Sequence, residues 1–516
     1  MPLFADLVAT GGNCITLDES LPRASALAVR DGRLIYVGDD AGARALAGPQ
    51  TRHVALNGRT VTPGFVDAHI HLLMYGAMLL RQVDLVGTAD LNELLDRLSA
   101  HAARSPEGWI HGRGFDQDKM AERRFPTRAD LDRVSTTRPI LITRVCGHAA
   151  VANSAALALI TPEERAAGDP ETGLYTEGDI GAFYRRIPPL SEAQQEEAVL
   201  RASAVALRTG ITSVHTLLDT PDQMGAYARL HRRGALPLRV TGMPPYHTTA
   251  SLYANGVGTT FGDDWLRFGA AKFFSDGSLG ARTALLAAPY ADDPERTDNL
   301  GIRIYDPEDL KAKASDAHAK GFQIAIHAIG DQAVRETLDA IEAALGADGD
   351  NGWHRHRVEH VSLLAPDQRE RMARRKIVAV VQPQFVTSDT WTGERVGKER
   401  STWGYPFRSM LRAGIPLALS SDCPVESLDA FACLAAAVGR HAWSPDETLT
   451  PEEALRAYCL GGAFAAHAED RLGSLEAGKL ADFVVLSDDP THLDAAGIRA
   501  LKAEQVFVGG REVQRE

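Results

Sequence analysis

Two histidines with the spacing of metal ligands lie early in the sequence, in the segment GFVDAHIH at residues 64–71. His69 and His71 end an apolar run, and residues i and i+2 of a β-strand point to the same side. Both imidazoles can therefore reach one ion. An isolated H-x-H pair is a weak indication, because hydrogen-bonded or solvated histidines are commoner than metal ligands. The pair predicts a metal site only if other segments supply further ligands.

Four more side chains of ligand or catalytic type occur late in apolar runs. They are Lys272 in FGAAKFF, His327 in IAIHAIGD, His360 in VEHVS and Asp422 in LALSSDCPVE. Neutral imidazoles and carboxylates suit zinc and neighbouring divalent ions. A buried group of such side chains is costly unless a metal or hydrogen bonds satisfy it. Together with the histidine pair, these residues predict one divalent-metal site.

Each of these residues also has a simpler explanation when taken alone. A single histidine such as His327 or His360 is more often hydrogen-bonded in a core, and Lys272 has Asp276 as an ion-pair partner. Asp422 is a candidate N-cap for the next helix, because aspartate favours that position and a proline follows closely. Their recurrence at successive strand ends favours a shared site over four separate explanations.

The middle of the chain alternates short β-branched runs with helical patterns, which is typical of parallel β/α units. Eight or nine parallel strands favour a TIM barrel, whose enzymes carry their chemistry at the C-terminal ends of the strands. Predicted helices include residues 91–105, 191–210 and 307–321, and Asp331 is expected to cap another. The predicted strands are TVTPGFVDAHIH, PILITRV, ITSVHTL, PLRVTGM, LRFGAAKFF, FQIAIHA, HRVEHVSL, KIVAVVQPQ and IPLALSSD.

The two ends of the chain have a different pattern, in which short β-rich runs are separated by tight turns. Asp31-Gly32, Asn57-Gly58 and Gly509-Gly510 are the turn signals, and each predicts a hairpin. We expect the two ends to form one small β domain. A segment from about residue 75 to 135 holds helical and polar loop patterns and is predicted to be an insertion after the first barrel strand.

Composition limits the classes of binding partner and the cellular compartment that we expect for this protein. The 516 residues are 44% hydrophobic and 24% charged, as in globular proteins, and the net charge of -13 disfavours nucleic acid or an anionic membrane as a partner. Five scattered cysteines without C-x-x-C spacing disfavour a disulfide framework and a zinc ribbon. With no signal peptide or membrane-span pattern, we expect a cytoplasmic protein.

The chain resembles the amidohydrolase superfamily, and most closely its amidohydrolase-3 branch, which includes N-substituted formamide deformylase-like proteins. The resemblance rests on PGFVDAHIH, KFFSDGSLGARTA, IAIHAIGD, RVEHVS, LSSDCPVE and GSLEAGKLADFVVL. It implies an α/β fold, a distorted TIM (β/α)8 barrel with a small β-sandwich built from both termini. The expected limits are 1–60 and 471–516 for the sandwich and 61–470 for the barrel domain.

The same resemblance implies one or two divalent ions, with zinc favoured and manganese, cobalt, iron or nickel allowed. By that resemblance, His69 and His71 bind the more buried ion, and His327 and His360 bind the other. Asp422 completes the site. Lys272 either bridges two ions as a carboxylated lysine or stays unmodified beside a single ion; burial favours the neutral amine that adds carbon dioxide.

The implied reaction is hydrolysis of a carbon–nitrogen bond by activated water, with Asp422 transferring the proton to the leaving nitrogen. His148, in RVCGHAAVANSAAL, is a candidate catalytic residue for contact with the substrate carbonyl. Arg282 is a candidate partner for a substrate carboxylate, although a structural ion pair explains it as well. Trp391 is a candidate pocket wall, with packing of its loop as the alternative.

We expect cleavage of an amide, N-formyl or N-acyl bond in a small organic substrate. Deamination, or hydrolysis of a cyclic amide, carbamate or ester on the same site, is the second interpretation. A non-catalytic regulatory relative is the third, and it predicts the loss of a ligand, whereas all six ligand positions are present. A homo-oligomer is a mild expectation, because helices around a barrel often form subunit contacts.

Overall fold

The computed structural model describes residues 4–105, 107–144, 149–218, 220, 222–293, 297–346, 353–439 and 445–513. The chain forms two compact units, one made of Met1–Leu72 with Ala202–Glu516 and the other of Leu73–Arg201. Within the described ranges, no helix combines the length and the apolar character needed to cross a membrane. The four cysteines in these ranges are buried and free.

Two parallel sheets of the first unit carry the strand ends on which the candidate ligands lie. One has the strand order β16-β15-β14-β8 and the other β17-β18-β19-β20-β21. Their strands are mostly buried runs of Val, Ile, Ala and Phe, as expected for parallel sheets covered on both faces. Among the described residues, no continuous ladder closes the two sheets into a single barrel. The strands are β8 (Phe65–Ile70), β14 (Ile211–Leu217), β15 (Arg239–Met243), β16 (Leu266–Phe268), β17 (Ala271–Phe274), β18 (Ile324–Ala328), β19 (Arg357–His360), β20 (Val378–Val381) and β21 (Leu417–Leu419).

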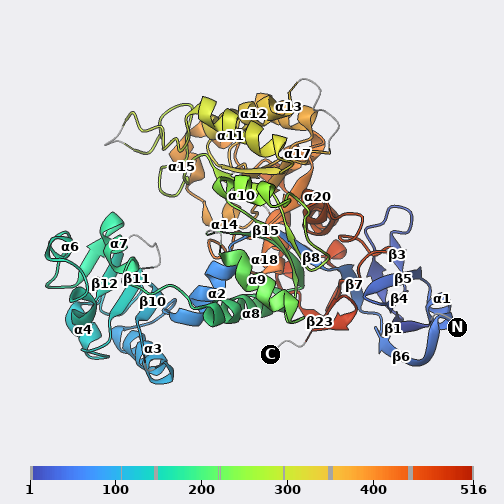
Figure 1. The fold of residues 1–516 in the computed structure, drawn as a ribbon, viewed down its shortest axis with the longest axis horizontal. Coiled ribbons are helices and arrows are strands. Elements are labelled where there is room, and N and C mark those ends of the chain that lie inside the picture. The colour runs from blue at the N-terminus through green and yellow to red at the C-terminus, as the bar shows by residue number, and fades with distance from the viewer. Residues whose placement is uncertain are drawn as a thin grey trace. The chain divides into compact units, whose positions relative to one another are not determined.

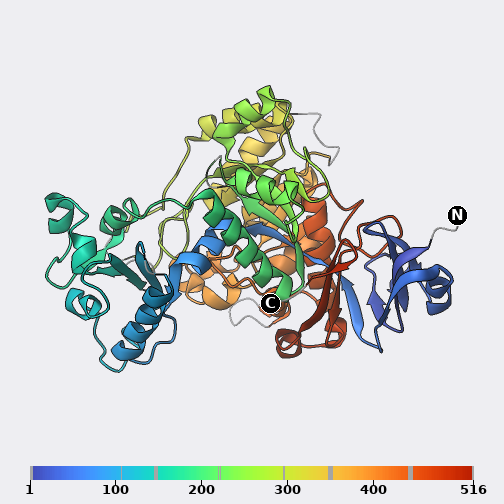
Figure 2. The ribbon, with the colours of Figure 1, turned by 60° about the horizontal axis from the view of Figure 1, so that its bottom comes forward.

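Strands from both ends of the chain share one six-stranded sheet, with the order β24-β23-β22-β7-β2-β3. Blue N-terminal and red C-terminal strands lie side by side in Figures 1 and 2, where β7 pairs antiparallel with β22. A four-stranded sheet, β5-β4-β1-β6, shares a hydrophobic core with it. The strands are β1 (Ala5–Thr10), β2 (Asn13–Ile15), β3 (Arg23–Ala24), β4 (Ala26–Arg30), β5 (Arg33–Gly38), β6 (Ala47–Ala55), β7 (Thr60–Pro63), β22 (Phe483–Leu486), β23 (Ala503–Val508) and β24 (Arg511–Glu512).

Gly64 divides the predicted strand TVTPGFVDAHIH into β7 and β8, which belong to different sheets. A side chain at this position would place its Cβ 2.1 Å from the Thr212 hydroxyl, so only glycine allows the backbones to approach this closely. The Gly64 N–H donates to the Asp482 carbonyl of the C-terminal segment. This junction leads the chain from the terminal sheet directly into the strand that carries His69.

Two of the three predicted hairpins are confirmed. Asp31-Gly32 joins β4 to β5 with φ of +49° and +76°, and Gly509-Gly510 joins β23 to β24 with φ of +56° and +70°. These are the positive values that a two-residue turn with a primed geometry needs. Asn57-Gly58 also has positive φ at both residues, but the hairpin prediction is wrong there. Strand β6 pairs with β1 whereas β7 pairs with β2 and β22, so the two strands that flank this turn do not pair with each other.

The second unit contains its own sheet, with the order β13-β12-β11-β10-β9. The segment PILITRV, predicted as a strand of the parallel β/α region, is β11 of this sheet and pairs parallel with β10 and antiparallel with β12. That assignment was wrong because both units alternate strands with helices. The elements are β9 (Gln82–Asp84), β10 (Ile110–Phe115), β11 (Ile140–Arg144), β12 (Ala149–Ala152), β13 (Leu174–Thr176), α3 (Leu91–Arg104), α4 (Arg128–Asp132), α5 (Ser154–Leu157), α6 (Pro162–Ala166) and α7 (Gly181–Tyr184).

The remaining helices connect the strands of the first unit or lead between the units. In Figure 1, α11, α12 and α13 gather on one side of the β17–β21 sheet. Asp331 is the first residue of α12 rather than its predicted cap; Gly330 is the N-cap, and the Asp331 carboxylate accepts from the Ala287 N–H at 3.2 Å. The helices are α1 (Asp40–Ala45), α2 (Leu72–Arg81), α8 (Glu192–Arg208), α9 (Gln223–Arg232), α10 (Thr249–Ala254), α11 (Pro307–Ala319), α12 (Asp331–Leu345), α13 (Pro366–Arg375), α14 (Phe385–Ser388), α15 (Thr392–Val396), α16 (Lys398–Ser401), α17 (Phe407–Arg412), α18 (Ala430–Val438), α19 (Pro451–Arg456), α20 (Gly462–Ala465) and α21 (Ala495–Arg499).

Candidate metal centre

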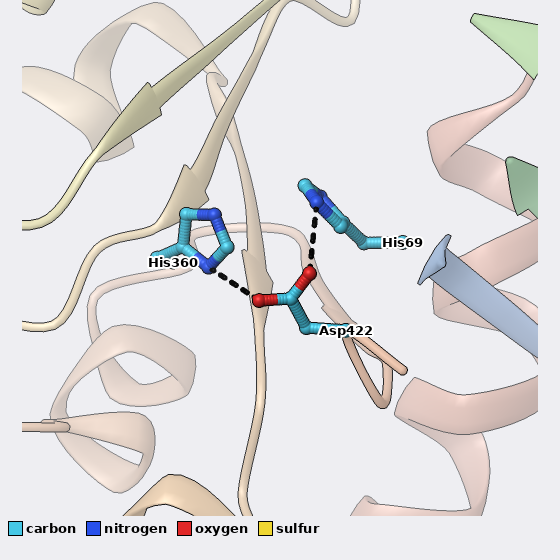
Figure 3. A group of neighbouring side chains, drawn as sticks. All are labelled: His69, His360 and Asp422. Carbon is cyan, nitrogen blue, oxygen red and sulfur yellow. Dashed lines mark ion pairs between the residues drawn. The ribbon is translucent and has the colours of Figure 1, made fainter. Parts of the chain in front are cut away.

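Three side chains of ligand type meet at strand ends that are far apart in the sequence. His69 lies near the end of β8, His360 at the end of β19, and Asp422 in the loop after β21. Their ligand atoms lie within 4.8 Å of one another, and all three residues are buried. His69 Nε2 is 3.4 Å from Asp422 Oδ1, and His360 Nδ1 is 3.9 Å from Asp422 Oδ2. Figure 3 shows the two imidazoles approaching the carboxylate from different sides.

The other three predicted ligands lie around this group. His71 Nε2 is 3.6 Å from Asp422 Oδ1, and the ring of His327 is 4.4 Å from that of His360 between centroids. Both of these histidines are partly exposed, whereas Lys272 is buried, with 3% of its surface accessible. The Lys272 charge acts on both His360 and Asp422 and opposes protonation of each. The structure therefore brings all six side chains into one neighbourhood.

Hydrogen bonds fix which ring nitrogen of His69 and His327 carries the proton. His69 Nδ1 bonds the buried Glu359 carboxylate, which can only accept, so Nδ1 carries the proton and Nε2 keeps its lone pair. In the same way, His327 Nε2 lies 2.9 Å from the Gly277 carbonyl, which leaves Nδ1 of that ring as the free acceptor. These contacts use one N–H of each ring and leave one lone pair for a ligand.

A chain of hydrogen bonds orients His360. Ser420 Oγ donates to the Val381 carbonyl at 3.1 Å and accepts from the Gln382 amide nitrogen at 2.9 Å. The Gln382 amide oxygen therefore faces His360 Nδ1, at 2.8 Å, and that nitrogen donates. His360 is left with a lone pair on Nε2. This orientation is the arrangement that metal-binding histidines usually have, with the second nitrogen donating to a protein acceptor.

The backbone at two of these residues has an uncommon conformation. His360 has φ of +74° and Asp422 has φ of +55°, values that cost a non-glycine residue roughly 1–3 kcal/mol. The loop after β21 is held on β8, because Asp422 N–H donates to the His69 carbonyl and His71 N–H to the Cys423 carbonyl, both at 2.9 Å. Asp422 does not cap α18; its N-cap is Asp429. The N-cap alternative for Asp422 is therefore wrong.

Burial sets the protonation of the group. Desolvation lowers the pKa of His69 and of His360 well below the ordinary value, so both rings are neutral near pH 7, the form that binds metals. Burial also raises the pKa of Asp422 to about 6, against the opposing charges of His71 and Lys272. A buried set of neutral imidazoles and a carboxylate with free lone pairs is the donor set that a zinc-like ion takes.

The predicted substrate contacts have other partners in this structure. Arg282 forms a two-point ion pair with Asp292, at 3.0 Å from Nε and 2.8 Å from Nη2. The Trp391 ring packs against the Arg395 guanidinium, 3.8 Å from the ring centroid. His148 lies outside the described residues. The roles of all three stay predictions.

Sequence reasoning missed Glu359 and Gln382, which orient His69 and His360. Both lie within quoted strand segments, VEHVS and KIVAVVQPQ. Their signal in the sequence is a polar side chain inside an otherwise apolar strand, which is costly unless it is hydrogen-bonded. The partner of such a side chain depends on how the strands meet and is not visible from one sequence.

The sequence profile of the amidohydrolase family matches residues 52–514. The chain belongs to this family. LONG AFTER FAR-RED 3 of Arabidopsis thaliana is 33% identical to it, over 99% of this chain and 92% of its own. N-substituted formamide deformylase of Arthrobacter pascens is 30% identical, over 99% of this chain and 98% of its own. The family resemblance drawn from the motifs is thereby confirmed.

A solved structure agrees with the family assignment. The crystal structure of an uncharacterized metal-dependent hydrolase from Pyrococcus furiosus superposes with a TM-score of 0.82 and 33% identity, covering 94% of this chain and 99% of that one. An α/β fold and a metal-dependent hydrolase activity for this amidohydrolase are both supported by the similarity.

Proposed function

We propose that this amidohydrolase cleaves a carbon–nitrogen bond of a small organic substrate, an amide or an N-formyl or N-acyl amine. The observation that carries the proposal is the buried meeting of His69, His360 and Asp422 at strand ends. The similarity to an N-substituted formamide deformylase along nearly the whole chain favours this bond type.

The residues that would hold one or two divalent ions, with zinc favoured, are His69, His71, Lys272, His327, His360 and Asp422. A bound ion would polarise the scissile carbonyl and lower the pKa of water. Carboxylation of Lys272 remains part of the proposal for a two-ion site; its burial favours the neutral amine which that modification requires.

Asp422 is the proposed proton carrier. Its carboxylate lies between His69, His71 and His360, where it could take a proton from an activated water and return it. The returned proton goes to the leaving nitrogen, because an amide anion is a poor leaving group.

Substrate contacts are proposed for three residues. His148 would donate to the carbonyl oxygen as it gains negative charge. Arg282 would bind a substrate carboxylate only by exchanging it for Asp292, its present partner. Trp391 would form an aromatic wall of the pocket.

We also infer that the two parallel sheets together form the distorted TIM barrel, and that the two terminal sheets form the β-sandwich. Support comes from the hydrogen bonds that join the end of β21 to β8, from a bridge between Pro245 and Lys272, and from the core shared by the terminal sheets. The domain limits of 1–60, 61–470 with an insertion at about 75–135, and 471–516, the cytoplasmic location and the homo-oligomer remain predictions.

The test is turnover by the purified protein with zinc. Simple N-formyl and N-acyl amines should release the free amine. Asp422→Asn should abolish release while zinc content stays at the wild-type level, because the amide keeps an oxygen for an ion but cannot carry the proton. Asp429→Asn is the matched control, because Asp429 caps α18 through its side chain. This control should turn over normally. Unchanged turnover by Asp422→Asn would remove that residue from the mechanism.

The identity of the reaction product distinguishes the remaining candidate functions. Release of ammonia without a carboxylic acid would identify a deaminase, and release of an alcohol would identify an ester hydrolase. A protein that binds zinc yet turns over none of these substrates would favour a regulatory role.

A further inference from the structure

A buried ion pair lies directly behind His69. Arg357 and Glu359 are two residues apart on β19, and their side chains are almost completely shielded from solvent, with 2% and 0% exposed. Arg357 donates to both Glu359 oxygens, from Nε to Oε1 and from Nη2 to Oε2 at 2.9 Å. The same Oε2 accepts from His69 Nδ1. One carboxylate thus receives three N–H groups.

The guanidinium of Arg357 is itself held on two further strands. Its Nη1 lies 3.1 Å from His215 Nδ1 on β14, and its Nη2 donates to the carbonyl of Ala68, the residue before His69 on β8. The Glu359 carboxylate is therefore fixed in position by three N–H donors, which are held in turn by strands β8, β14 and β19.

We propose that Arg357 and Glu359 are positioning residues of the metal centre: they hold the proton of His69 on Nδ1 and so keep its Nε2 lone pair directed at Asp422. The inference rests on the proposed function for the identity of the centre. It assigns to the pair a role in metal affinity, beyond any contribution to folding. Outer carboxylates of this kind typically change metal affinity by about 10–100-fold.

Counting donors and acceptors gives a specific expectation for Glu359→Gln. A glutamine at this position offers one acceptor oxygen to three N–H donors and places its own NH₂ against one of them. If that NH₂ faces His69, the imidazole must accept at Nδ1, and its proton moves to Nε2, where the metal would bind. Zinc affinity should then fall at least tenfold.

Two double variants distinguish the effect of losing the acceptor of His69 Nδ1–H from the effect of losing the ion pair. Arg357→Met/Glu359→Met removes the pair and leaves His69 Nδ1 without an acceptor, while two apolar residues fill the space at little cost to folding. Arg357→Met/Glu359→Gln removes two of the three donors, so the glutamine oxygen can again accept from His69. We expect the second variant to bind zinc at least fivefold more tightly than the first. A purely structural pair does not predict this rescue.

A second buried ion pair provides the matched control. Arg239 contacts Asp482 through Nε at 2.6 Å and Nη2 at 2.8 Å, and the two side chains are 4% and 3% exposed. Among the described residues, the Asp482 carboxylate also accepts from a backbone group, the N–H of Gly509. Asp482→Asn therefore perturbs an equally buried pair on the same unit, at a place where the described contacts include no candidate ligand.

The experiment measures zinc affinity by competition with a chromogenic chelator, the visible spectrum of the cobalt-substituted protein, and thermal unfolding of each apoprotein. We expect Glu359→Gln and the Met/Met variant to lose at least tenfold in affinity and to shift the cobalt bands. Asp482→Asn should keep wild-type affinity and spectrum even if it unfolds at a lower temperature. If Glu359→Gln does not fold, the two double variants give the same comparison.

Wild-type affinity and spectrum in the folded variants at 357 and 359 would overturn the inference. So would equal affinity of the two double variants. Neither result depends on hydrolysis, so a protein that binds zinc as described but cleaves no amide would refute the proposed function and leave the positioning role standing.

Discussion

Two groups of histidines lie at opposite ends of the same two strands, and they use their ring nitrogens in opposite ways. The metal-centre cluster lies where β18 and β19 end, and the distal cluster lies where they begin. Each contains an H-x-H pair, at residues 69–71 and at 354–356. The metal-centre cluster is His69, His71, His327 and His360 with Asp422; the distal cluster is His318, His354 and His356.

Every ring nitrogen that accepts in the distal cluster already has a protein donor. His356 Nδ1 accepts from the Ile324 N–H at 3.1 Å, and its Nε2 therefore donates to His318 Nδ1 at 3.0 Å. His354 Nδ1 accepts from the His356 N–H at 2.8 Å, and its Nε2 donates to the Arg375 carbonyl at 2.9 Å. In the metal-centre cluster, by contrast, the protein accepts from one ring nitrogen of His69, His327 and His360, and the other nitrogen of each of these rings keeps its lone pair.

Burial does not distinguish the two clusters. Desolvation lowers the pKa of His356 well below its ordinary value, as it does for His360. Spacing does not distinguish them either, since both pairs read H-x-H. The direction of the hydrogen bonds does, because a ring that accepts from the protein at one nitrogen carries its proton on the other and has no lone pair for an ion.

The largest expected effect comes from the same substitution made in both clusters. His360→Leu removes one proposed ligand and leaves the Gln382 oxygen without its donor, so we expect bound zinc to be lost and hydrolysis to fall by roughly 1,000-fold or more. Metal analysis and amine release measure the two effects. His356→Leu should keep its zinc and stay within about twofold of wild-type turnover; a comparable loss there would show that the clusters are not distinct.

The second prediction concerns stability. His356→Leu leaves the buried Ile324 N–H without an acceptor, and such an unpaired group costs about 1–3 kcal/mol. We expect the free energy of unfolding of the apoprotein in urea to decrease by that amount. A chelator in the buffer prevents bound zinc from contributing. An unchanged free energy of unfolding would mean that the hydrogen bond from Ile324 to His356 contributes little to stability.

The sequence predicted which side chains approach one another but not how their hydrogen bonds run. Apolar runs ending in His69, His360 and Asp422 identify strand ends, and parallel strands bring such ends to one edge. The direction of the His69 ring depends on Glu359 of β19, and that of the His360 ring depends on Gln382, which follows β20. These partners are fixed by strand register, which no local pattern encodes.

The wrong predictions also concern pairing partners that no local sequence pattern encodes. Asn57-Gly58 has the conformation of a hairpin turn, yet the partners of β6 and β7 are chosen by the rest of the two terminal sheets. The residues of β11 form a strand as predicted, but in a different sheet. Local chemistry predicted the elements well, whereas the partner of each element was decided by tertiary packing.

Gln382→Leu tests the orientation of His360 with a smaller expected effect. Loss of the amide oxygen removes the acceptor of His360 Nδ1–H, and we expect zinc affinity to fall about tenfold, the lower limit for an outer partner. Chelator competition measures it. Ser420→Ala, which removes the group that orients the glutamine, should lower affinity less. Equal affinity of Gln382→Leu and wild type would mean that the ring holds its orientation without this bond.

The smallest effect is a difference in pH dependence that tests the distal cluster without using metal. Since burial lowers the folded-state pKa of His356 below the ordinary value of 6.5, the unfolded chain binds the extra proton first as the pH falls. Stability from this residue is therefore complete well above pH 6.5 and is lost progressively as the pH falls toward and below that value. From pH 7.5 to 6.0 the loss for one such group is about 0.8 kcal/mol. Urea unfolding of the apoprotein at both values should show wild type losing more stability than His356→Leu, by about this amount. Equal losses would show that His356 is already able to take up a proton in the folded protein, and the fixed direction of bonds assigned to the distal cluster would then be wrong.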